Sequence, residues 1–270
     1  MLLTDSHCHL DHLDLSAFDY SLSALARYCR ERGVGRLLSV ATDLDSARRL
    51  DGLLGSGVDG IYTSVGVHPL QTGCVALPSH EELVQAAMRE HVIAIGETGL
   101  DRHYGEDNKE WQRQSFIIHA QVAKTCGKPL IVHSRAARDE TLAVLRNHVD
   151  PELAGVLHCF TESWEMARAA LDFNFYISIS GIVTFKNALA LRETVKNIPI
   201  DRLLIETDAP WLAPVPYRGR KNHPEYLPAV ARCIAELKNI PVEELAETTN
   251  ENFDRLFRIS GKSATITVSH

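Results

Sequence analysis

The alternation of short apolar runs with longer amphipathic stretches constrains the fold of this chain most. The short runs are rich in Val, Ile and Leu, which is typical of parallel strands buried on both faces. We predict eight strands, at Leu2–Asp5, Arg36–Ala41, Gly60–Val67, Val92–Gly96, Pro129–His133, Gly155–His158, Tyr176–Ser180 and Leu203–Glu206. Helices are predicted between and after them, at Leu22–Glu31, Leu44–Leu54, His80–Glu90, Lys109–Cys126, Arg138–Asn147, Trp164–Phe173, Asn187–Lys196, Leu227–Leu237 and Val242–Phe257.

Eight such units in 270 residues predict an α/β fold, a single-domain (β/α)8 TIM barrel. The alternative is a doubly wound open sheet, but no Gly-rich phosphate loop follows the first predicted strand. The composition does not shift sharply along the chain. We therefore predict one barrel domain at 1–258 and a polar C-terminal tail at 259–270.

The composition indicates a soluble cytoplasmic protein. The sequence contains no apolar run near the ~18 residues of a membrane span, and its start does not resemble a signal peptide. Six cysteines are scattered without a C-x-x-C pair, which is typical of reduced thiols. We expect no membrane association, and no obligate protein partner is evident. The net charge of −7 argues against a broad electrostatic binding surface for duplex nucleic acid. It does not exclude a narrow site that binds one chain end.

Histidines and carboxylates follow most of the predicted strands. His7 and His9 are two residues apart, so in an extended strand both imidazoles point to one face and can share a metal ion. A single histidine after a strand is more often structural. In a barrel, however, all strand ends converge on one face, so a whole set of such residues predicts a metal site there. The other members of the set are His68, Glu97, Asp101, His133, His158, Glu206 and Asp208.

These strand-end segments resemble those of the TatD-type metal-dependent hydrolases, in the amidohydrolase superfamily. The matching segments are Asp-Ser-His-Cys-His-Leu-Asp at 5–11, Gly-Val-His-Pro at 66–69, Gly-Glu-Thr-Gly-Leu-Asp at 96–101, His-Ser-Arg at 133–135, Gly-Val-Leu-His-Cys-Phe at 155–160, Glu-Thr-Asp-Ala-Pro at 206–210, and Arg218-Gly219 with Asn222 and Pro224. The resemblance implies a TIM barrel, one or two divalent metals and hydrolysis, usually described as deoxyribonuclease activity. The family commonly has aromatic residues directly after Gly-Leu-Asp. Here Arg102 and His103 precede Tyr104, a difference that bears on substrate preference.

We assign the ligands to two divalent ions. His7, His9 and Asp208 are assigned to one ion, and His133 and His158 to the second. Glu97 lies between these groups around the barrel and is expected to bridge both ions, as the resemblance also implies. Imidazole and carboxylate ligands suit Zn, Mn or Mg.

The expected chemistry is attack by a hydroxide that the two ions generate from water, so no Ser or Cys nucleophile is needed. We assign Glu97, Asp208 and Glu206 to the catalytic set. Asp208 is expected to accept the proton of the attacking water as well as to bind metal. Glu206 is on the same strand face. It is a further ligand, a group that orients a histidine, or a member of an ion pair inside the barrel.

Four residues are predicted to contact substrate. His68 either donates to a phosphate or is a turn residue before Pro69, and Asp101 either orients a histidine or caps its loop. Arg135 is a candidate phosphate contact. Arg218 belongs to a basic cluster after the last strand, where barrels often hold phosphate; the cluster also contains Arg220, Lys221 and His223. Two aromatic residues near this cluster are in a position to stack a base, although the first of them could equally be core: Trp211 and Tyr217.

The leading functional hypothesis is a divalent-metal-dependent hydrolase of ester bonds. It would act as a phosphodiesterase or deoxyribonuclease that trims single-stranded or 3′-end DNA. The alternative is hydrolysis of a carboxylic ester or amide, such as the aminoacyl ester of a tRNA, because the same hydroxide attacks a carbonyl equally well. The least favoured hypothesis is a non-catalytic barrel that uses metal only for stability.

Overall fold

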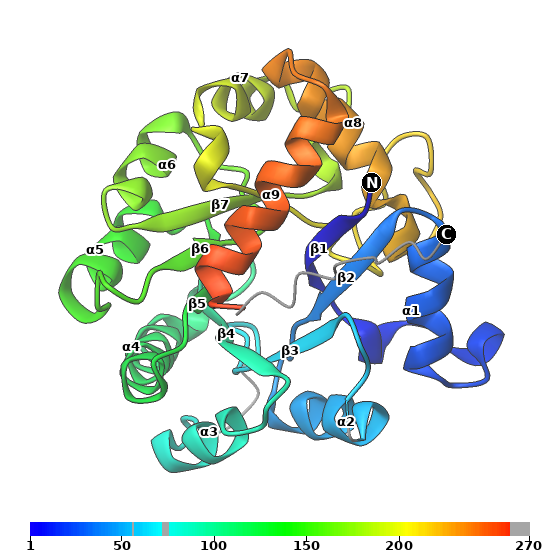
Figure 1. Cartoon of the computed structure of the whole chain (residues 1–270). Coiled ribbons are helices and arrows are strands. Elements are labelled where there is room, and N and C mark those ends of the chain that lie inside the picture. Colours follow the sequence, from blue (N-terminus) through cyan, green and yellow to red (C-terminus); the bar gives the residue numbers. More distant parts are fainter. Residues whose placement is uncertain (56, 72–75, 260–270) are drawn as a thin grey trace.

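The computed structural model describes residues 1–55, 57–71 and 76–259 of the chain. In this part of the chain, parallel strands follow one another around one sheet in the order β1 to β8 (Figure 1). The predicted (β/α)8 barrel is therefore confirmed. Except for Ile259, the predicted polar tail at 259–270 lies outside the described residues. The strands are β1 Leu3–Cys8, β2 Val34–Ser39, β3 Ile61–Val65, β4 Val92–Asp101, β5 Leu130–Arg135, β6 Gly155–Leu157, β7 Phe175–Ile179 and β8 Leu203–Ile205.

Helices surround the sheet, and side-chain caps fix where several of them begin. Asp43, for example, accepts the Ser46 amide at the start of α2, and Ser79 accepts the Glu82 amide at the start of α3. None of the described helices is long and apolar enough to cross a membrane. The α-helices are α1 Leu22–Glu31, α2 Leu44–Leu54, α3 His80–Ala87, α4 Lys109–Cys126, α5 Arg138–His148, α6 Trp164–Leu171, α7 Leu189–Asn197, α8 Leu227–Lys238 and α9 Val242–Phe257.

The sheet closes where β1 meets the end of β8. The Asp208 amide donates to the His7 carbonyl at 2.9 Å, and the His9 amide donates to the Ala209 carbonyl at 2.8 Å. These residues lie at or just beyond the carboxyl ends of the two strands. Closure of the barrel therefore places the N-terminal histidines beside Asp208.

Helix α9 covers the opposite end of the barrel. Leu38 and Ile131 belong to an apolar cluster that is separate from the larger core packed under the outer helices, because side chains alternate between the two faces of a strand. Phe253 of α9, which lies across the barrel in Figure 1, joins this inner cluster. Asn252 of the same helix donates to the carbonyl of Leu203, where β8 begins. Helix α9 thus covers the amino-terminal ends of the strands, so a functional site is expected at their carboxyl ends.

The second half of β4 differs most from its predicted bounds. The prediction ends this strand at Gly96, whereas the strand runs to Asp101. Its pairing with β5 continues through Gly99, which lies opposite His133. As a result, Glu97 is held inside a strand at the barrel mouth instead of in a loop.

Candidate metal centre

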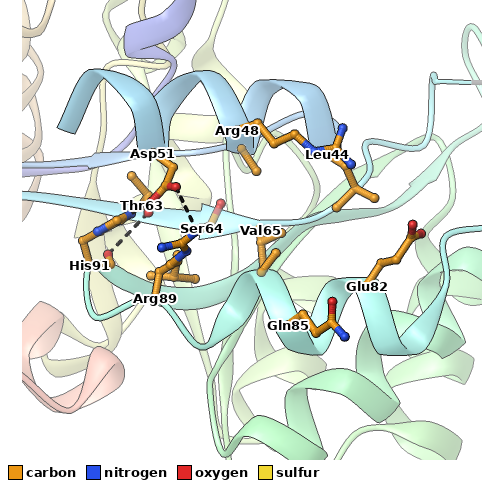
Figure 2. A pocket seen from close by; sticks show the side chains of 13 residues that line it. Leu44, Arg48, Asp51, Thr63, Ser64, Val65, Glu82, Gln85, Arg89 and His91 are labelled. Atoms are coloured by element: carbon orange, nitrogen blue, oxygen red, sulfur yellow. Dashed lines mark hydrogen bonds and ion pairs between the residues drawn. The ribbon is translucent and has the colours of Figure 1, made fainter. Parts of the chain in front are cut away.

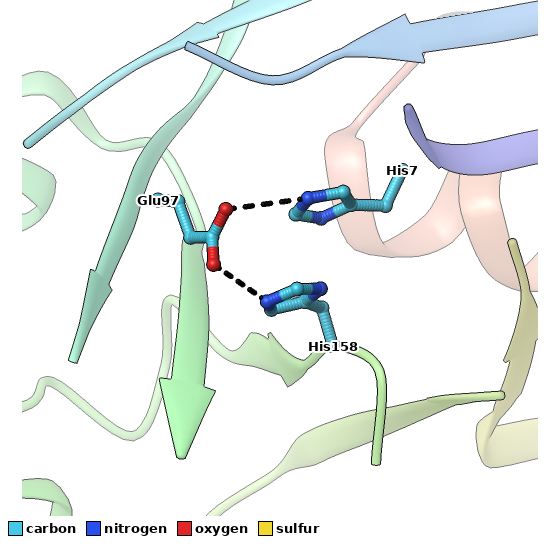
Figure 3. Close-up of side chains that lie close together, drawn as sticks. All are labelled: His7, Glu97 and His158. Carbon is cyan, nitrogen blue, oxygen red and sulfur yellow. Dashed lines mark hydrogen bonds and ion pairs between the residues drawn. The ribbon is translucent and has the colours of Figure 1, made fainter. Parts of the chain in front are cut away.

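Glu97 lies at the centre of a cluster of imidazole and carboxylate groups at the carboxyl ends of the strands. Its side chain is almost completely buried. Its Oε1 lies 2.7 Å from His158 Nε2, and its Oε2 lies 3.4 Å from His7 Nε2. Figure 3 shows one carboxylate oxygen facing the edge of each ring, and the rings, which come from β1 and from the end of β6, are stacked on each other. Three residues that are far apart in the sequence therefore meet at one point.

The first group of possible ligands contains His7, His9 and Asp208. Their ligand atoms lie within 4.8 Å of one another. His9 Nε2 is 3.1 Å from His7 Nε2 and 3.4 Å from Asp208 Oδ1. The structure thus brings together the three residues that the sequence assigned to one ion.

The second group surrounds the other oxygen of Glu97. His133 Nδ1 and His68 Nε2 each lie 3.2 Å from Glu97 Oε1, on the same oxygen that faces His158. Glu97 therefore lies between the two predicted ligand sets, as a bridging residue would. The segment before His68 approaches β4 tightly, since a Cβ on Gly66 would lie 2.4 Å from the Gly96 carbonyl carbon.

Hydrogen bonds on the far side of two rings show which nitrogen offers a lone pair to the centre. His9 Nδ1 donates to the Val40 carbonyl at 2.8 Å, so the neutral ring keeps its lone pair on Nε2. His133 Nε2 donates to Asp101 Oδ2 at 3.1 Å, which leaves the lone pair on Nδ1. In both rings the unprotonated nitrogen is the one that faces the cluster.

His68 is arranged in the opposite way. Its Nδ1 accepts the Leu70 amide at 3.0 Å, so the proton of the neutral ring is on Nε2. Burial lowers the pKa of His68, although Glu97 opposes this effect. His68 therefore presents an N–H group to the centre, whereas His9 and His133 present lone pairs.

This donor set fits a divalent cation. His133 Nδ1 and Glu97 Oε1 are two electron-pair donors 3.2 Å apart, and such a contact is favourable only with a proton or a metal ion between them. In the metal-free protein a proton on His133 has the same effect. Burial opposes charge on His133, but Asp101 and Glu97 outweigh burial and raise its pKa. Burial likewise disfavours the Glu97 carboxylate, yet His158 and His68 hold its pKa well below the usual range. Imidazole and carboxylate donors suit Zn, Mn and Mg.

Known proteins with similar sequences and structures agree with this geometry. Residues 4–258 match the family described as TatD related DNase. The chain belongs to the TatD family. It is 47% identical over 259 residues to the uncharacterized metal-dependent hydrolase YcfH of Escherichia coli (strain K12), with 96% of this chain and 97% of that protein covered. It is also 38% identical over 259 residues to the uncharacterized metal-dependent hydrolase YabD of Bacillus subtilis (strain 168), with 96% of this chain and 100% of that protein covered.

A solved structure supports the same assignment. The crystal structure of YjjV, a TatD homologue from E. coli K12, superposes with a TM-score of 0.87 at 29% identity, covering 96% of this chain and 98% of that one. This TatD-family protein is therefore a metal-dependent hydrolase.

Glu206 lies behind His158 in the TatD-family barrel. Its carboxylate is fully buried, accepts the Cys159 amide at 2.8 Å and lies 3.4 Å from His158 Nδ1. Of the three roles that the sequence left open, the geometry supports the one that orients a histidine. The assignment of Glu206 to the catalytic set stays a prediction.

Asp101 also lies behind a ring, and both of its oxygens are used by the protein. Oδ2 accepts from His133 Nε2, while Oδ1 accepts the amides of His103 and Tyr104 at 2.8 Å each. The side chain is buried. This geometry supports its two alternative roles, orienting a histidine and capping the loop, and its contact with substrate stays a prediction.

We predict that Asp101→Asn weakens metal binding by about 10- to 100-fold. The Asn oxygen would keep the two backbone amides, so its NH2 group would face His133 Nε2 and shift the ring proton to Nδ1, the nitrogen that faces the centre. Calorimetric titration of the metal-free protein with Mn²⁺ or Zn²⁺ measures the affinity. Glu140→Gln is the matched control, because Glu140 pairs with the neighbouring Arg102 and is 51% exposed. Equal affinities in both variants would contradict the positioning role.

Two buried residues of α4 brace the site and were missed by the sequence analysis. Gln112 Oε1 accepts the Asp101 amide at 2.9 Å, and its Nε2 donates to the Gly105 carbonyl at 3.0 Å. His119 Nε2 accepts the Val67 amide at 2.9 Å, and burial lowers its pKa to about 4, which keeps the ring neutral. The available signal was a polar residue on the buried face of an amphipathic helix.

Arg135 and Arg218 lie exposed on the surface of this TatD-family protein. The Arg135 guanidinium is 4.7 Å from the centre of the Tyr104 ring, and that of Arg218 is 3.8 Å from the Phe185 ring. Arg218 also donates to the Ala213 carbonyl at 3.4 Å. Their contacts with substrate stay predictions.

A separate pocket lies between α2 and α3, over the outside of β3 (Figure 2). Asp51, one of its two acidic residues, pairs with Arg89 and with His91, at 3.3 Å each. None of its lining residues belongs to the ligand groups described above. The candidate metal centre therefore lies apart from this pocket.

Proposed function

We propose that this protein is a metal-dependent phosphodiesterase that removes nucleotides from the 3′ end of single-stranded DNA. The observation that carries the proposal is the position of Glu97, whose two oxygens face two different groups of possible metal ligands. The match to a family described as TatD related DNase supports the choice of substrate. The low overall affinity for duplex expected from a net charge of −7 favours a single-strand end.

Part of the cluster is open to solvent. The side chains of Asp208, His68 and His133 are 13%, 17% and 18% exposed, whereas His7 is fully buried. A substrate therefore approaches these three residues first. Divalent ions, when bound there, supply Lewis-acid stabilisation of charge on a phosphoryl oxygen and lower the pKa of water.

The side chains on the open side have complementary roles in the proposed reaction. Burial opposes ionisation of Asp208, but His9 and His7 outweigh burial and lower its pKa, so at neutral pH it is a carboxylate able to accept the proton of the attacking water. His68 directs its Nε2–H toward the same space and is placed to donate to a phosphoryl oxygen. Proton acceptor and hydrogen-bond donor thus face the reacting group together.

A substrate panel tests this proposal. Metal-free protein, reloaded with Mg²⁺, Mn²⁺ or Zn²⁺, is assayed on single-stranded oligonucleotides, the same oligonucleotides with a phosphorothioate 3′ linkage, duplex DNA, and carboxylic ester and amide substrates. We expect stepwise release of nucleotides from free 3′ ends, a block by the phosphorothioate, and rates about 10²- to 10⁴-fold lower in Asp208→Asn. Hydrolysis of an ester or amide with all oligonucleotides left intact would overturn the phosphodiesterase proposal in favour of carbonyl chemistry.

A further inference from the structure

We propose that Trp211 forms a stacking platform for the nucleobase next to the bond that is cut. This inference rests on the proposed function, because it names how the same site holds its substrate. The indole is 46% exposed, so it is not part of the core. A large aromatic surface that remains open beside a buried polar cluster is a feature that base stacking uses.

The indole lies directly against the proposed metal centre. Its ring centre is 4.8 Å from that of His9 and 5.5 Å from that of His12. His9 in turn faces Asp208 at 3.4 Å. The indole therefore lies beside the place that a phosphate would occupy near Asp208, on the β1 and β8 side of the mouth.

The backbone that carries Trp211 is held firmly, so the platform is preorganised. The Trp211 amide donates to the Asp208 carbonyl at 2.9 Å. The buried Asn222 side chain donates to the carbonyls of Trp211 and Thr207, and the Asn222 amide donates to the carbonyl of Pro210. These hydrogen bonds hold the backbone of Trp211 in place beside Asp208.

Other aromatic residues around the mouth are less suited to this role. Tyr217, the second residue that the sequence suggested for stacking, lies parallel to Tyr226 at 3.8 Å between ring centres, so one of its faces is occupied. Tyr104 is exposed, but its ring contacts Arg135 and His103, which are outside the ligand groups, whereas the Trp211 ring contacts His9. Stacking on an indole tolerates all bases, since each base offers a π face, so we expect little sequence preference.

The test compares two ligands that differ only in the base: thymidine 5′-monophosphate and 2-deoxyribose 5-phosphate. Both are titrated into the full-length protein with saturating Mn²⁺, by calorimetry and by quenching of indole fluorescence. Wild-type protein is expected to bind the nucleotide roughly 5- to 150-fold more tightly than the sugar phosphate. Trp211→Ala should remove this difference without changing the affinity for the sugar phosphate, and Trp211→Phe should keep most of it. Val215→Ala is the control, because Val215 is an exposed residue of the same loop.

Each outcome decides the inference separately from the proposed function. A nucleotide preference that survives in Trp211→Ala would place the base elsewhere and overturn the platform. So would equal binding of both ligands by the wild-type protein. Binding is measured without turnover, so a protein that prefers the nucleotide through Trp211 but leaves oligonucleotides intact would refute the proposed reaction and not the platform.

Discussion

Replacing Glu97 by glutamine is expected to reduce kcat by roughly 10³- to 10⁶-fold, on the scale of losing one member of a catalytic unit. Glu97 Oε2 faces His7 of the first ligand group, and Glu97 Oε1 faces His133 and His158 of the second. The glutamine is the same size but carries no charge, and its NH2 group would turn a donor toward His7 Nε2 or toward His158 Nε2. We expect the metal content, measured by mass spectrometry after reloading and gel filtration, to fall from the two ions proposed for the wild-type protein to at most one.

Glu206→Gln is the matched control for this prediction. Both residues are buried glutamates that contact His158, but Glu206 does so from behind, at Nδ1. We expect Glu206→Gln to lower metal affinity by only about 10- to 100-fold and to keep activity at saturating metal. If Glu97→Gln retained two ions and near-normal turnover, Glu97 would not be the bridging group, and the assignment of two ion positions around it would fail.

The ligand groups were predictable from the sequence because a closed barrel makes order along the chain equivalent to position around a ring. His7 and His9 lie two residues apart at the end of β1, and Asp208 follows β8, so closure alone makes them neighbours. Glu97 on β4 was then the carboxylate left between this group and His133 on β5. The pattern of strands, together with the rule that strand ends converge, was therefore enough to predict which ligands lie near one another.

The groups behind the ligands were not predictable in the same way. Whether Asp101 faces substrate or His133 depends on β4 continuing past Gly96 in register with β5, which a run of Glu, Thr and Gly does not indicate. The Val67 amide is bound by His119 from a helix about fifty positions later, a contact that only tertiary packing defines. Such residues hold other groups in place through tertiary contacts, so no fixed spacing in the sequence identifies them.

Replacing Gly99 by alanine is expected to lower the free energy of unfolding by about 4 kcal/mol, at the upper end of single substitutions. Gly99 has φ +130°, which L side chains rarely adopt, and a Cβ there would lie 2.0 Å from the His133 carbonyl oxygen and 2.9 Å from its carbonyl carbon. Both are backbone atoms of the paired strand, so a change of side-chain rotamer does not relieve the clash. β4 and β5 must move apart at the point where His133 faces Glu97.

Gly52→Ala provides the control, and the expected change in stability has the opposite sign. Gly52 lies in α2, is exposed, and would place its Cβ with nothing within 4 Å. Alanine there is expected to stabilise by about 0.5–1 kcal/mol, since glycine loses more conformational freedom on entering a helix. Urea unfolding of the metal-free proteins measures both changes, and the thermal midpoint of Gly99→Ala should fall by roughly 10 °C. If Gly99→Ala stayed within about 1 kcal/mol of wild type, the barrel mouth would be able to yield at β4, and close approach of these strands would not be what holds His133 against Glu97.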